Sequence, residues 1–135
     1  MNTYINLCVA DVKRSRSFFT ALGFGFNDNF SDAESIAMRI SDSCFVMMLQ
    51  PGKFKGFTPR EIADATRTTE VMTALQLDSR AAVDAMVEAA VAAGGSVFRA
   101  AEEHGFMYGR SFCDPDGHVW EPFWFDPAAV PENPS

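Results

Sequence analysis

Hydrophobic and polar positions along the first half of the chain predict one helix among short strands. Residues 3–9 are β-branched and apolar, which indicates a strand. A helix should follow, because Asp11 is a suitable N-cap, apolar side chains then recur on one helical face, and Gly23 is suited to the C-terminal end. Three further strands are expected, at about 24–28, 34–40 and 43–49.

The second half repeats this order of elements. A strand at 69–78 precedes an Ala-rich helix at 79–95, which Gly94 and Gly95 close. Three more strands are expected, at about 96–100, 105–113 and 118–125. The pattern therefore predicts an α+β fold of two tandem βαβββ modules.

The segment between the modules has a different composition. Pro51, Gly52 and Gly56 interrupt it, and a short helix is predicted over residues 58–65 with Thr58 as N-cap. We expect a single domain over residues 1–135, with module one at about 3–50, a connector at 51–67, module two at 68–126 and a C-terminal tail at 127–135.

Composition narrows the class of protein. With 135 residues, 47% of them hydrophobic, the chain is long enough for one packed core. A net charge of −7 opposes binding to nucleic acid or to an anionic membrane, and we expect neither partner. The first residues show no secretory signal, and three scattered cysteines suit reduced thiols, so a cytoplasmic location is expected.

Two segments carry a resemblance to a known family. They are INLCVADVKRSRSFFTALGF at 5–24 and YGRSFCDPDGHVWEPFWFD at 108–126. Both resemble the vicinal oxygen chelate (VOC) superfamily, which contains glyoxalase I, bleomycin resistance proteins and extradiol dioxygenases. The resemblance implies a curved mixed sheet in each module, with the two sheets around a cleft. In the metal enzymes of this family, His, Glu or Gln ligands stand on the first and last strand of each module.

Only one of these four ligand positions keeps a metal-binding side chain. The resemblance places the positions on Tyr4, on Met47 or Met48, on Met72 and on Glu121. Thioethers are poor ligands for a hard or borderline divalent ion, so no cofactor is expected. A divalent metal held through Glu121 remains the alternative.

Strand alternation assigns the side chains of the cleft if Glu121 points inward. Phe123 and Phe125 then share its side, while Trp120 and Trp124 face away. Arg110 is the expected ion-pair partner of Glu121. The sequence does not decide which face of strand 105–113 points inward, because a shift of one residue in strand register would exchange the two faces. His104 either turns toward Glu121 or is a loop histidine. The predicted ligand-binding residues are Tyr4, Asn6, Met72, Tyr108, Arg110, Glu121 and Phe123.

These observations leave two functional hypotheses. The first is a metal-independent protein that binds a small aromatic or cationic molecule in an apolar cleft, which 13 Phe and 7 Met residues would suit. The alternative is a glyoxalase-like lyase or isomerase that uses Glu121 as the catalytic base, with or without a metal. A dioxygenase is not expected, because two histidines in these places cannot form its iron site. Either protein should be a homodimer, with Trp120 and Trp124 as a candidate contact patch if they face outward.

Overall fold

The computed structural model describes residues 1–129 of the chain. The chain divides into two compact units, Met1–Thr68 and a second that begins at Thr69. This boundary lies within a residue of the predicted start of module two, so the predicted connector belongs to the first unit. Residues 130–135 of the predicted tail lie outside the described residues.

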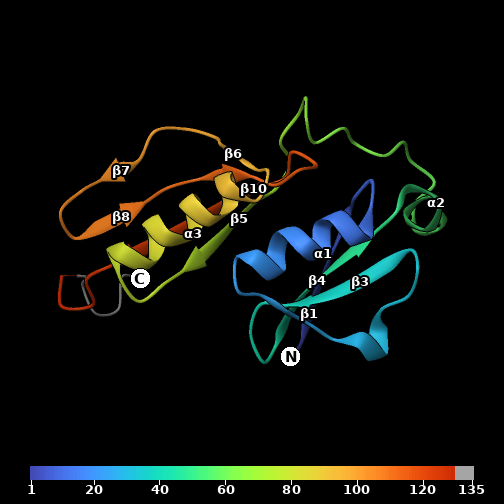
Figure 1. Ribbon diagram of the computed structural model, residues 1–135, viewed down its shortest axis with the longest axis horizontal. Coiled ribbons are helices and arrows are strands. Elements are labelled where there is room, and N and C mark those ends of the chain that lie inside the picture. The colour runs from blue at the N-terminus through green and yellow to red at the C-terminus, as the bar shows by residue number, and fades with distance from the viewer. Residues whose placement is uncertain (130–135) are drawn as a thin grey trace. The chain divides into compact units, whose positions relative to one another are not determined.

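The first unit is a four-stranded sheet with a helix across one face (Figure 1). Its strands run in the order β1-β4-β3-β2, with β1 parallel to β4 and the other pairs antiparallel. The elements are β1 (Thr3–Cys8), α1 (Val12–Ala21), β2 (Gly25–Phe26), η1 (Asp28–Phe30), β3 (Ser35–Arg39) and β4 (Cys44–Leu49).

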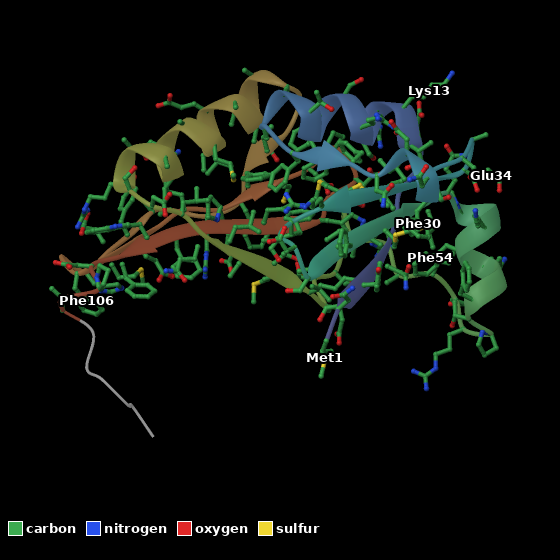
Figure 2. All side chains as sticks on the ribbon, turned by 90° about the horizontal axis from the view of Figure 1, so that it is seen from below. Met1, Lys13, Phe30, Glu34, Phe54 and Phe106 are labelled. Carbon is green, nitrogen blue, oxygen red and sulfur yellow. The ribbon has the colours of Figure 1, made fainter. Side chains whose placement is uncertain are left out.

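Helix α1 has the ends and the buried face that the sequence predicts. The Asp11 carboxylate accepts hydrogen bonds from the backbone N–H groups of Lys13 and Arg14, and Gly23 adopts a φ of 98° just after the helix. Phe18 and Phe19 are buried against the sheet. Lys13 lies on the opposite side of the helix and points away from the sheet (Figure 2).

The alternation of β4 decides which of two adjacent methionines lies on the open face of the first sheet. Met48 is 0% exposed and shares the helix-covered side with Val46. Met47 is half-buried and pairs with Asn6 of β1, so both side chains stand on the uncovered face. Of the two candidates that the resemblance gives for the first module's second ligand position, Met47 is therefore the one on the uncovered face.

The connector contains a helical turn, but not where the sequence predicts it. The turn comprises α2 (Pro51–Phe54) and η2 (Lys55–Phe57), and Pro51 occupies the first helical turn. The predicted helix at 58–65 is wrong. Thr58 is extended, as expected for a residue that precedes a proline, and its hydroxyl accepts a local bond from the Arg60 N–H at 3.1 Å.

The second unit repeats the topology of the first. Strand β5 pairs in parallel with β10, which pairs antiparallel with β8 and β9, and these pair with β7 and β6 at the edge. The predicted repeat of strand, helix and three strands is confirmed (Figure 1). The elements are β5 (Met72–Gln76), α3 (Arg80–Ala92), β6 (Ser96–Val97), β7 (Glu102–Glu103), β8 (Met107–Gly109), β9 (Phe112–Cys113) and β10 (Val119–Phe125).

Two predicted strands of this unit are interrupted. The ladder between 105–113 and β10 breaks where the Arg110 N–H donates to the Pro122 carbonyl at 3.1 Å, because proline has no N–H to return the bond. At the edge, four residues (98–101) lie opposite two (110 and 111), since Val97 pairs with Phe112 and Glu102 with Gly109. This excess forms a bulge in the edge strand.

The DPDG segment forms a turn around a buried carboxylate. Asp114 is 4% exposed and accepts bonds from the N–H groups of Asp116 and His118 and from the Trp120 indole. Trp120 is 0% exposed, which rules out the predicted contact patch. Its partner Trp124 lies under the guanidinium of Arg80, 5.0 Å from the ring centre, at the N-terminus of α3.

Arg80 also joins α3 to the β7–β8 hairpin. Its Nη2 lies 2.8 Å from Glu103 Oε1 and donates to the Gly105 carbonyl at 2.7 Å. These Arg80 bonds, together with the Gly105 N–H, lower the pKa of Glu103 from 4.5 to about 2. Phe106 stands at the tip of this hairpin, between β7 and β8 (Figure 2).

The Glu103 pKa predicts part of the acid sensitivity of the fold. A lowered folded pKa stabilises the folded state above pH 4.5, and this contribution disappears as the pH falls toward 2. Urea unfolding between pH 5 and pH 2 should therefore give a shallower pH dependence for Glu103→Gln than for the wild type. Glu88→Gln, exposed on α3, controls for the loss of one carboxylate. Equal slopes for Glu103→Gln and the wild type would contradict the assignment.

Candidate functional site

The uncovered face of the second sheet is organised around Glu121 in β10. Its direct neighbour on β5 is Ala74, and the register of the β8–β10 and β9–β10 pairs places Ser111 on its other side. Phe123 shares the same face, next to Gln76 and Gly109, and stacks with Phe125 at 6.2 Å. The predicted orientation of Glu121 and Phe123, opposite to the tryptophans, is confirmed.

A cavity of about 240 Å³ opens on this face. Its wall combines apolar groups, small residues and two carboxylates, and it includes the predicted residues Arg110, Glu121 and Phe123. Gly109 has no side chain to occupy the space beside Phe123. A Cβ added at this position would lie 3.6 Å from Phe123 Cβ, which is an ordinary contact, so a larger side chain there would fill part of the cavity. The cavity is lined by Ala74, Arg99, Ala100, Glu102, Met107, Gly109, Arg110, Glu121, Pro122 and Phe123.

Glu121 is paired with Arg99, not with Arg110. The Arg99 guanidinium contacts Glu121 through Nη2, and its Nη1 lies 3.5 Å from Glu102 Oε1. Glu121 is 17% exposed, whereas Arg99 and Glu102 are 49% and 45% exposed at the rim. His104 does not reach Glu121 but lies 3.9 Å from Glu102, so it is a loop histidine at the rim.

Arg110 and Tyr108 direct their polar ends to the helix-covered side of the sheet. Arg110 Nη1 donates to Asp84 of α3 at 3.0 Å, and the Tyr108 hydroxyl donates to the same oxygen at 2.6 Å. The bond from Tyr108 and then that from Arg110 lower the pKa of Asp84, while the pKa of Tyr108 is raised by its bond to Asp84. The predicted Arg110–Glu121 pair is therefore wrong. Arg110 stands opposite Pro122, one residue from Glu121, and alternation turns it to the other face.

The remaining predicted site residues lie on the uncovered faces of their own sheets. In the first unit, Tyr4 is 53% exposed and stacks on Phe45 at 5.1 Å, and Asn6 stands two residues along the same face of β1. In the second unit, Met72 is half exposed and pairs with Val119, on the same face as Glu121. Their roles as ligand-binding residues stay predictions.

The side chains at the family's ligand positions do not fit a divalent cation. Met47 and Met72 offer thioethers, and the Glu121 carboxylate is already bound to a guanidinium. Among residues 1–129, no group of three or more His, Cys, Asp or Glu side chains is placed to hold a metal ion.

Arg99 is the residue of this candidate site that the sequence pattern did not reveal. A regular strand over 96–100 would give it no special position, whereas the bulge at 98–101 presents it to Glu121. The only available signal is the run of small and charged residues after Phe98, which suits an edge bulge but does not specify one.

Comparison with known proteins agrees with this architecture. Residues 3–121 match the Glyoxalase/Bleomycin resistance protein/Dioxygenase superfamily, and the chain belongs to this family. No curated protein matches the sequence significantly. Across residues 1–129, no helix has the length and apolarity to cross a membrane.

Several solved structures are similar. A hypothetical protein from S. aureus is 27% identical, with a TM-score of 0.77 over 92% of this chain and 91% of that one. A glyoxalase-related enzyme from Fulvimarina pelagi is 21% identical, with a TM-score of 0.78 over 92% and 87% of the two chains. The fosfomycin resistance protein FosX from Mesorhizobium loti is 14% identical, with a TM-score of 0.64 over 95% and 92%. The last two likenesses concern the fold alone.

Proposed function

We propose that this protein binds a small organic cation, through its ammonium group and an apolar or aromatic body, in the cavity beside Glu121. The observation that carries the proposal is the charge of the cavity wall. The lining carries two carboxylates, Glu121 and Glu102, and the Arg99 guanidinium can balance only one of them, because Arg110 is already paired with Asp84. The net negative charge of this wall favours a cation over an anion.

The shape and composition of the cavity support a compact ligand. Its volume of about 240 Å³ lies below the roughly 300–1,000 Å³ that is typical of drug-sized ligand sites. Met107 and Phe123 supply a polarizable thioether and an aromatic ring for the ligand's body. We further propose that binding needs no metal, since the donor set described above lacks suitable ligands.

Three probes of similar size and different charge test this function. Titrations followed by protein NMR should show benzylammonium binding about tenfold more tightly than benzyl alcohol, because one charge-assisted hydrogen bond contributes about 1.5–3 kcal/mol when formed. Benzoate should bind more weakly than either. The shifts should centre on Gly109, Glu121 and Phe123. Preference for benzoate, or shifts confined to other regions, would reject the proposal.

Two substitutions in the cavity should separate charge from shape. Glu121→Gln should reduce benzylammonium affinity about tenfold and leave benzyl alcohol nearly unchanged. Gly109→Val, which fills space without changing charge, should weaken both probes. Glu88→Gln on α3 is the matched charge control. If Glu121→Gln behaved like this control, the carboxylate would not be the ligand's partner.

We also propose that the protein is a cytoplasmic homodimer. The exposed apolar side chains Tyr4 and Met72 on the uncovered sheet faces support association, and the reduced thiols of Cys8, Cys44 and Cys113 suit a reducing compartment. Sedimentation should give a mass near twice the chain's 14.8 kDa. A species at 14.8 kDa across micromolar concentrations would contradict the dimer.

A further inference from the structure

We propose that Arg99 is a built-in competitor for the cation site: it occupies Glu121 when the cavity is empty, and an incoming ammonium group displaces it onto Glu102. This inference rests on the proposed function and adds the residue that limits the affinity of the cavity for cations. Arg99 would thus act as an internal gate that opens only for ligands able to replace its charge.

The backbone of the bulge places Arg99 over Glu121 and limits what can move. Ser111, which stands beside Glu121 and is 1% exposed, accepts a hydrogen bond from the Arg99 N–H through its hydroxyl at 3.1 Å. The Ser111 carbonyl accepts a second bond from the Phe98 N–H at 3.3 Å. The backbone is therefore anchored at Arg99, and exchange between partners needs only rotation of the long side chain.

Glu102 gives the displaced guanidinium a second partner within reach. Its Oε1 already lies 3.5 Å from Arg99 Nη1, so the two carboxylates flank one guanidinium. Glu121 is the more enclosed of the two, and an enclosed carboxylate without a counterion is costly. Arg99 therefore satisfies Glu121 unless another cation takes its place, while the more exposed Glu102 can also rely on water.

In this arrangement, only a positively charged ligand can contact the Glu121 carboxylate directly. A cationic ligand replaces Arg99 at Glu121 and leaves every charge paired. A neutral ligand offers Glu121 no replacement charge, so Arg99 stays in place and the ligand gains only apolar contacts. Competition with Arg99 also lowers the affinity for cations below what Glu121 alone would give.

Removing the competitor should strengthen cation binding. Arg99→Gln should raise benzylammonium affinity about fivefold to tenfold, since a partly enclosed ion pair no longer has to be broken, and should leave benzyl alcohol nearly unchanged. Arg60→Gln, an exposed position in the first unit, controls for the change in net charge. The side-chain Nε–H signal of Arg99 should shift on titration of the wild type with benzylammonium but not with benzyl alcohol.

A double-mutant cycle tests the transfer to Glu102. If Glu102 receives the displaced guanidinium, Glu102→Gln should weaken benzylammonium binding in the wild type and have a clearly smaller effect in the Arg99→Gln background. If Glu102 merely attracts the ligand, the effect would be equal in both backgrounds, and the gate would be rejected.

The outcomes separate this inference from the proposed function. Tight, Glu121-dependent binding of benzylammonium with no gain in Arg99→Gln would refute the gate and keep the function. Failure of both the wild type and Arg99→Gln to prefer benzylammonium over benzyl alcohol would refute both.

Discussion

Replacing Asp114 with alanine is expected to lower the free energy of unfolding by about 3 kcal/mol, because several buried donors lose their acceptor at once. The carboxylate accepts bonds from the Asp116 N–H at 2.9 Å, the His118 N–H at 3.1 Å and the Trp120 indole at 3.0 Å. Trp120 is completely enclosed, so water cannot replace the lost partner. Chemical unfolding at pH 7 measures the loss.

The ionisation of Asp114 makes the free energy of unfolding depend on pH. Burial raises the pKa of this carboxyl, against the opposing effects of the nearby His118 and the Trp120 bond. A raised folded pKa means that the folded state holds its proton more tightly than the unfolded chain does. The tighter binding of this proton stabilises the folded state at low pH. That stabilisation declines as the pH rises from 3.8 through the folded pKa of Asp114.

A double-mutant cycle isolates the bond between Asp114 and Trp120. Trp120→Phe removes the indole N–H, so Asp114→Ala should cost about 1.5 kcal/mol less in that background than in the wild type. Some cost should remain, because the two backbone N–H groups still lose their acceptor. Additive losses would show that the indole bond does not stabilise the turn.

Replacing Met48 with alanine is expected to cost about 3 kcal/mol of unfolding free energy, whereas the same change at Met47 should cost less than about 1 kcal/mol. The two residues are adjacent and chemically identical, but Met48 is 0% exposed under α1 and Met47 stands on the uncovered face. The first change leaves a cavity in the core, and the second removes a half-buried side chain that water can replace.

Each methionine variant is the control for the other. Urea unfolding of both proteins, with equal m-values, would give the difference directly. Equal destabilisation would mean that the alternation of β4 is wrong by one residue. Met48, not Met47, would then occupy the position that corresponds to the family's metal ligand.

Local chemistry in the sequence determined most of the elements and their faces. Asp11 and Gly23 fix the ends of α1 through hydrogen bonding and a positive φ, and both signals act within a few residues. The alternation that turns Glu121 and Phe123 away from Trp120 is likewise a property of any extended strand. The repeated βαβββ order followed from these local patterns.

Pairing between distant segments decided the rest. Sequence alone could not choose between Met47 and Met48, because the choice depends on which face of β4 α1 covers. The ion pair of Glu121 depended on a two-residue excess in the edge strand, which brings Arg99 to the carboxylate. It also depended on the strand register that places Arg110 opposite Pro122, because Arg110 then turns toward Asp84 on the other face. Strand register and bulges arise from the fit of one strand to its neighbours, and a shift of one residue exchanges the two faces.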